Sequence, residues 1–240
     1  MSDTTTSFPS KEKKVFKQCK INDFEAMIAE TLGALDKVLE QRTKDLNLWG
    51  EKEQRDFLNI FGWEGNEVVH VDMPVRGVSN LVEMTAKEVI FDCVERISYV
   101  RGTMTVSSFL NRIDSAREVC ASVKGEPQDN YEVEIGINFV GRRNRNNGKD
   151  RICMSITGRD SRVSTLCHEL SHIPKQYASP KDGGIGASDY DSKGIKKSPY
   201  KDDMESYEQH VAGANLLIFN KSECVFDNAY NLERYFEIDI

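Results

Sequence analysis

Apolar side chains recur at helical spacing through the first half of the chain. Over residues 22–42 they fall three and four positions apart, which predicts an amphipathic helix with these apolar positions: Phe24, Met27, Ile28, Leu32, Leu35, Val38 and Leu39. The same spacing predicts a short helix over residues 51–61, ending near Gly62, and two further helices over residues 82–99 and 106–123. The first half is therefore expected to be helical.

The period of the pattern changes to two after residue 130. Residues 131–140 alternate between apolar and polar side chains, which predicts a strand, and residues 152–158 read as the returning strand of a hairpin. The basic, Asn-rich residues 142–150 are expected to form its turn. Helical spacing returns over residues 203–219, and Ser222 is a candidate cap for a last segment. This order of elements predicts an α+β fold, mostly helical with a small antiparallel sheet.

The stretch with the most specific chemistry has the form H-E-x-x-H, at His168, Glu169 and His172. On a helix the two His side chains lie one turn apart on one face, so both imidazoles can bind a single cation. Zinc suits two neutral imidazoles plus a third ligand, with a position left for water whose pKa falls to about 7. Glu169 is then placed to act as general base and afterwards as general acid. The competing interpretation is a surface helix that carries two His by chance.

Composition narrows the choice of partners. The chain has 240 residues and a net charge of −7, which argues against a nucleic-acid partner held by phosphate neutralisation. It has no apolar run near the ~20 residues of a membrane span, and its first residues lack the apolar core of a secretory signal. We therefore expect a protein without a membrane span, cytoplasmic or exported by a non-classical route.

Two other residue types have simpler interpretations. The six Cys form no C-x-x-C pair, so free thiols are expected rather than a disulfide framework or a thiolate zinc site, and Cys167 is expected to be a small buried apolar residue. His70 stands alone in a stretch predicted to be extended, residues 66–75, and a structural role is expected for it.

Three segments together resemble the aspzincins, the zincin family of deuterolysin and peptidyl-Lys metalloendopeptidase. They are the H-E-x-x-H sequence, the later helix containing Tyr207, and the C-terminal segment, which matches at Asn228, Ala229, Asn231, Glu233 and Tyr235. The resemblance covers roughly residues 130–240. It implies a zincin-like fold, one Zn²⁺ per chain and an endopeptidase that acts on peptide or protein substrates.

The resemblance also implies a third ligand and an oxyanion donor. In the family, an Asp stands three positions before a Tyr at the start of the helix that follows the active-site helix, but Met204 occupies that position here. Asp203 lies four positions before Tyr207, on the same helix face, so Asp203 is the predicted third ligand and Tyr207 the predicted oxyanion donor.

Other third ligands stay open: Asp202, Glu205, Glu208 and Asp189, with His210 a weaker option. Asp189 ends a Gly-Ala-Ser-Asp sequence similar to part of the family motif, but it lacks the Tyr-Gly that should follow.

The expected organisation is a flexible N-terminal tail over residues 1–20 and a single zincin-like domain over 21–240, with a helical part 21–125 and a catalytic part 126–240. The expected activity is zinc-dependent peptide hydrolysis. The rival hypothesis, motivated by Met204, is a catalytically inactive zincin-like domain that binds proteins. A further hypothesis is a delivered toxin or effector protease, whose partners would include an inhibitor or immunity protein.

Overall fold

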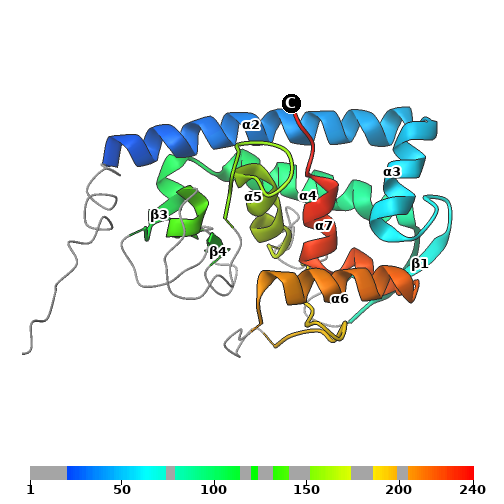
Figure 1. Cartoon of the computed structure of the whole chain (residues 1–240). Coiled ribbons are helices and arrows are strands. Elements are labelled where there is room, and N and C mark those ends of the chain that lie inside the picture. Colours follow the sequence, from blue (N-terminus) through cyan, green and yellow to red (C-terminus); the bar gives the residue numbers. More distant parts are fainter. Residues whose placement is uncertain are drawn as a thin grey trace, which may run out of the picture.

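The computed structural model describes residues 21–73, 79–113, 120–123, 132–140, 152–173, 186–198 and 205–240. Within these ranges, helices dominate and two small sheets complete the fold (Figure 1), so the predicted α+β class is confirmed. The predicted flexible tail over residues 1–20 lies outside the described residues. Every described helix is too short or too polar to cross a bilayer.

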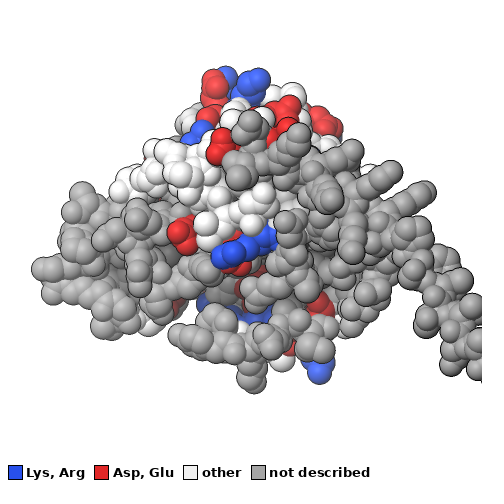
Figure 2. Space-filling model, turned by 90° about the vertical axis from the view of Figure 1, so that its left-hand side faces the viewer, with Lys and Arg blue, Asp and Glu red and all other residues white. Residues whose placement is uncertain are grey.

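The first two predicted helices are confirmed. Helix α2 spans Ile21–Leu48 and buries the apolar stripe that runs from Phe24 to Leu39. Helix α3 spans Glu51–Phe61 and ends at Gly62, whose φ of 72° is in the left-handed region that glycine adopts without strain. In Figure 1, α2 extends along one side of the molecule, and it contacts both α4 and α5. Charged side chains of both signs gather on the same upper side in Figure 2, as expected for a solvated helix face.

The third predicted helix begins later than the sequence pattern indicates. Residues 81–85 form strand β2 (Leu81–Thr85), which pairs antiparallel with β1 (Val68–Asp72), and helix α4 spans Ala86–Thr103. Thr85 forms a capping box with Glu88, and this fixes the helix start. The apolar residue Val82 fits a helical period equally well, but its partner across the sheet is Val71.

The predicted helix over residues 106–123 is wrong in its described parts. The chain forms a 3₁₀ turn, η1 (Val106–Ser108), and then β3 (Phe109–Asn111) and β4 (Ala121–Val123). Both strands pair with β5 (Val133–Ile135), β3 in parallel and β4 antiparallel. Three-residue strands are too short to show a period of two, so the sheet pairing could not be read from the pattern.

The predicted hairpin is also wrong. Strand β5 ends at Ile135 and continues as a 3₁₀ helix, η2 (Ile137–Val140). Over 152–158 the described residues form no strand, only a bridge between Ser155 and Ser161. Along β5 and η2, side chains on both faces are buried, including Glu134. The alternating pattern of this segment therefore does not mark a solvent-exposed face. The sheet beside the helix that carries the H-E-x-x-H sequence is mixed rather than antiparallel, and the predicted turn over 142–150 lies outside the described residues.

The C-terminal part supplies the elements around the H-E-x-x-H sequence: α5 (Arg162–Ser171), α6 (Tyr207–Phe219), the 3₁₀ helix η3 (Glu223–Phe226) and α7 (Ala229–Tyr235). The predicted helix over residues 203–219 begins only at Tyr207, because Ser206 is its extended N-cap, so the expected helical spacing between Asp203 and Tyr207 is wrong. Ser222 caps η3 by accepting a hydrogen bond from the Cys224 N–H. Helices α5 and α7 pack together in the middle of the molecule, between α2 and α6 (Figure 1). The described Cys residues are free thiols, and Cys167 is buried as predicted.

His70 connects two parts of the fold. Its Nδ1 lies 3.1 Å from Glu223 Oε1 in η3, and its Nε2 lies 3.4 Å from Glu83 on the paired strand. The hydrogen bond and charge of Glu223 raise the pKa of His70 above its usual value. The contact joins the β1–β2 ribbon to η3, which is a structural role.

The His70 contact predicts a pH-dependent component of stability. Because the folded-state pKa is raised, the protonated contact stabilises fully below the unfolded-state value of about 6.5, and this stabilisation is lost as pH rises through the folded-state pKa. We expect the urea midpoint of wild type to fall more between pH 6 and pH 8.5 than the midpoint of His70→Gln. Equal changes in the two proteins would contradict this role.

Candidate metal centre

Helix α5 holds the H-E-x-x-H sequence in a fixed orientation. Ser161 caps its N-terminus by accepting a hydrogen bond from the Ser164 N–H, and the helix buries these apolar side chains: Val163, Leu166, Cys167 and Leu170. His168 lies in the last turn, and His172 ends the helix in a right-handed helical conformation. The predicted one-turn spacing of the two imidazoles is therefore present.

A carboxylate from a distant segment meets both imidazoles. Asp189 Oδ1 lies 3.4 Å from His168 Nε2 and 3.8 Å from His172 Nε2. Among the described residues, these three form the group of His, Cys, Asp and Glu side chains whose ligand atoms are close enough to hold one metal ion. The His168 side chain is buried and Asp189 is partly exposed, so the group is reachable from one side.

Main-chain hydrogen bonds fix the position of Asp189. The Ala187 N–H donates to the Ser171 carbonyl at the end of α5 (2.8 Å). The Ser188 N–H donates to the Asp227 carbonyl (2.7 Å), and the Ser188 carbonyl accepts from Ala229 in α7. The segment before Asp189 is thus attached to both helices that meet at the site.

The other residues predicted as a third ligand either lie outside the described residues or do not lie with the two His side chains. Asp202 and the favoured Asp203 lie outside the described residues, so the prediction for Asp203 stays untested. The Glu205 carboxylate accepts hydrogen bonds from the Ser192 N–H (2.9 Å) and hydroxyl (2.7 Å), and Glu208 is exposed. Within the described part of the chain, Asp189 is the candidate that lies with both His residues.

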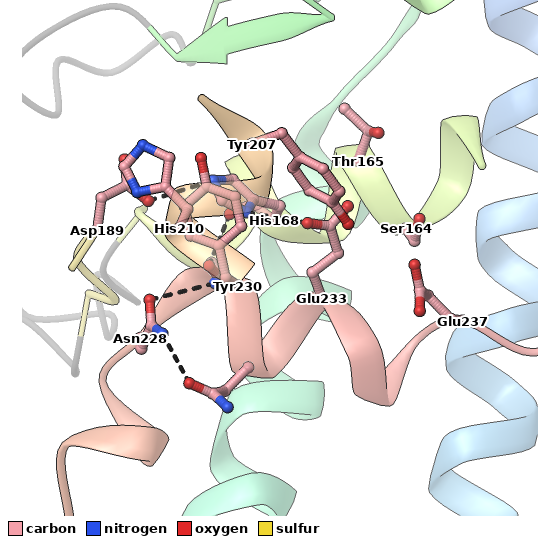
Figure 3. A network of polar contacts seen from close by, with 12 residues as sticks. Ser164, Thr165, His168, Asp189, Tyr207, His210, Asn228, Tyr230, Glu233 and Glu237 are labelled. Carbon is pink, nitrogen blue, oxygen red and sulfur yellow. Dashed lines mark hydrogen bonds and ion pairs between the residues drawn. The ribbon is translucent and has the colours of Figure 1, made fainter. Parts of the chain in front are cut away.

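A second layer of contacts orients the imidazoles. His168 Nδ1 lies 3.4 Å from Glu233 Oε2, and both side chains are buried. His172 Nδ1 lies 2.9 Å from the Ala187 carbonyl, which can only accept, so Nδ1 carries the proton and the neutral ring keeps a lone pair on Nε2. Both Nε2 atoms consequently face Asp189, as Figure 3 shows for His168, and such outer contacts are typical of metal-binding His.

Two polar atoms of this group are buried without a regular hydrogen bond among the described residues: Asp189 Oδ1 and His168 Nδ1. Their contacts of 3.4 Å have the distances of ion pairs but not the geometry of good hydrogen bonds. Buried polar groups are normally satisfied. A cation among the two Nε2 atoms and Asp189 would satisfy that oxygen, so the residues present fit a metal ion.

The charges of the group favour a cation. Burial alone would raise the pKa of Asp189, but its interaction with His168 and the charge of His172 hold that pKa below its usual value. Burial alone would lower the pKa of His172, but the nearby carboxylates of Asp189 and Glu169 raise it. The carboxylate of Asp189 is therefore ionised and available as a ligand.

A hydrogen bond from the sheet holds Glu169 close to the group formed by His168, His172 and Asp189. Its Oε2 accepts a hydrogen bond from the Val123 N–H of β4 (3.0 Å). Although part of the side chain is exposed, protein atoms surround the carboxyl group, and this burial raises its pKa above the usual value against the opposing charges of His168 and His172. A raised pKa suits a carboxylate that takes up and returns a proton near neutral pH.

Tyr207 and Tyr230 lie beside one another, with ring centroids 6.0 Å apart, but they have different partners. The Tyr207 hydroxyl lies 3.4 Å from Asp160 Oδ1, whereas the Tyr230 ring lies 4.6 Å from the His168 ring. Sequence reasoning gave no role to Tyr230 or Glu233. Their three-residue spacing on α7 places both on one helix face, and the i, i+3 pattern is the signal that could have linked them to the site.

Comparisons of the chain with models of known protein families, with curated proteins and with solved structures gave no match.

The Glu233 contact predicts an effect on metal affinity. Glu233→Gln removes the charge that faces His168 Nδ1, and loss of such a partner typically weakens metal binding about 10–100-fold. We expect that loss in a competition titration of Zn²⁺ against a chelator. Glu95→Gln, at an exposed position on α4, is the control. Equal zinc affinities for Glu233→Gln and wild type would show that Glu233 does not support the ligand.

Proposed function

We propose that this protein is a zinc-dependent endopeptidase whose metal ion is held by His168, His172 and Asp189. One observation carries the proposal: two imidazole Nε2 atoms and one carboxylate oxygen converge, and the carboxylate of Glu169 is held next to them. Three protein ligands with a remaining position for water are typical of catalytic zinc sites. One zinc ion per chain is proposed, on the chemistry of the donor set.

The proposed roles follow from the positions of the residues. Zinc, when bound, would polarise the scissile carbonyl and lower the pKa of a water molecule. Because Oε2 of Glu169 is held by the Val123 N–H, Oε1 is the oxygen that accepts the proton of the attacking water. The raised pKa of Glu169 favours this uptake of the proton, which Glu169 then gives to the leaving amine.

Strand β4 is the proposed docking edge for the substrate. It lies at an edge of its three-stranded sheet, with β5 on one side and α5 on the other. The Val123 N–H points away from β5 and toward Glu169. An extended peptide that pairs with this edge would pass beside the general base. In this proposal β4, and not the predicted hairpin, is the strand beside Glu169.

The proposed relationship to the aspzincins gains support from two segments. Asp189 ends the Gly-Ala-Ser-Asp sequence that is similar to the family motif, and it lies with the two His ligands. In the C-terminal segment, Glu233 faces His168, and Asn228 caps α7. The zincin-like fold is part of this proposal.

The rival hypothesis of an inactive binding domain rests on the absence of the expected ligand at Met204. Asp189 supplies a carboxylate at the two imidazoles, so the observation that motivated this rival loses its force. A delivered toxin or effector, with an inhibitor or immunity protein as partner, stays a prediction about biological role.

The test compares three preparations on a mixed peptide library read by mass spectrometry: zinc-loaded protein, the same protein stripped with a chelator, and stripped protein with zinc restored. We expect cleavage with zinc, loss of cleavage without it, and recovery on restoration. The cut sites would give the specificity. Cleavage that persists after complete zinc removal, or no cleavage of peptides or unfolded proteins by the zinc-loaded form, would contradict the proposal.

A further inference from the structure

The aromatic side chain of Tyr230 lies directly against the metal group. Its ring centroid is 4.6 Å from that of His168, in an edge-to-face arrangement at 73°. On its other side, the His210 ring stacks on it at 4.6 Å with an interplanar angle of 6°. Offset and edge-to-face contacts of this kind fix the orientation of a ring. Tyr230 is therefore held in one position between two imidazoles (Figure 3).

His210 is itself anchored beside the third ligand. It is buried, and its Nδ1 lies 2.9 Å from the carbonyl of Tyr190, the residue that follows Asp189. A carbonyl only accepts, so Nδ1 is the donor. Figure 3 shows His210 next to Asp189, and its charge contributes to the lowered pKa of that carboxylate. Tyr230 thus lies on the side of His168 where the metal ligands converge.

Tyr207, to which the family resemblance assigns the oxyanion, lies next to Tyr230, with ring centroids 6.0 Å apart, but its hydroxyl has a different partner. Its hydroxyl is 3.4 Å from Asp160, which precedes the N-terminus of α5. Figure 3 places Tyr207 beside Glu233, which faces the Nδ1 of His168 and not the Nε2.

We propose that Tyr230 is a further catalytic residue, whose hydroxyl donates a hydrogen bond to the oxyanion formed when water attacks the scissile carbonyl. The proposal rests on the peptidase function proposed above. The side chain is partly exposed beside His168. The hydroxyl acts only as a hydrogen-bond donor, so no proton is transferred from it. His210 positions the ring by stacking.

The first arm of the test measures kinetics on a peptide identified in the library. Tyr230→Phe keeps the stacked ring and removes only the hydroxyl. We expect kcat to fall about 10²–10³-fold, the loss typical for one oxyanion donor, with KM and zinc affinity within about threefold of wild type. Tyr99→Phe, at an exposed position on α4, is the matched control. Thermal unfolding of each variant confirms that it is folded.

The second arm needs no turnover. Acetohydroxamate is titrated into Co²⁺-substituted protein, and binding is followed in the visible spectrum of the metal. The probe requires only a metal ion with an open position, and its metal-bound oxygens lie where the oxyanion would form. We expect Tyr230→Phe to bind it about 3–10-fold more weakly, the effect of one lost hydrogen bond. Tyr99→Phe should bind it like wild type.

The outcomes distinguish the proposed role of Tyr230 from the proposed peptidase function. Loss in both arms for Tyr230→Phe supports the assignment. Unchanged kcat and unchanged hydroxamate binding would overturn it, as would losses found in Tyr207→Phe instead of Tyr230→Phe. If zinc-loaded wild type cleaves nothing, the peptidase function fails, and the hydroxamate arm alone decides whether Tyr230 faces the open position of the metal.

Discussion

Zinc-loaded Glu169→Gln protein is expected to cleave peptides about 10²–10⁴-fold more slowly than wild type while it still binds one zinc ion per chain. The amide of Gln has the size of the carboxylate, and its oxygen can still accept the Val123 N–H. It cannot take a proton from water, so the chemical step loses its base. The metal ligands are unchanged, and zinc affinity should therefore remain close to that of wild type.

The measurement for Glu169→Gln pairs initial cleavage rates with zinc content determined on the same samples. Glu95→Gln, on the exposed face of α4, controls for loss of one negative charge. Cleavage by Glu169→Gln at the rate of wild type would exclude Glu169 as the base and remove the mechanism proposed for this site.

Asp189→Ala is expected to lower zinc affinity more than ~100-fold. A lost outer-layer partner already costs about 10–100-fold, and Asp189 is the proposed direct carboxylate ligand and the group that faces both imidazoles. Zinc titrated against a chelator measures the loss. Asp23→Ala, at an exposed position on α2, is the control.

The same titration of Asp203→Ala distinguishes the structural assignment from the sequence-based one. If Asp203→Ala loses zinc and Asp189→Ala keeps it, the third ligand is the residue chosen from helix geometry, and the site described here is incomplete. If both variants lose zinc, both carboxylates bind, and the open position required for catalysis is filled.

The sequence predicts the elements whose apolar residues recur at a regular helical spacing. Helices α2 and α3 each bury one continuous face, so the spacing of Phe24, Ile28 and Leu32 was enough to place α2. The start of α4 was misplaced because Val82 fits both a strand and a helix, and only pairing with β1 decides between them. The short strands β3 and β4 owe their conformation to the buried β5 between them.

The candidate metal centre was also predicted only in part, again where local helix geometry was enough. His168, Glu169 and His172 are one helical turn, and their relation follows from helix geometry alone. Asp189 comes from a segment whose place is set by hydrogen bonds to the Ser171 and Asp227 carbonyls, which no local pattern encodes. The choice of Asp203 assumed a helical spacing from Tyr207, but α6 begins at Tyr207, so that spacing does not exist.

The most direct test of the metal centre is a crystal structure of the zinc-loaded protein with anomalous difference data at the zinc edge. We predict one peak per chain, about 2.0–2.2 Å from His168 Nε2, His172 Nε2 and Asp189 Oδ1, with the remaining position open toward Glu169. No peak at this group, or a peak whose fourth position is closed by another protein side chain, would contradict a catalytic zinc site.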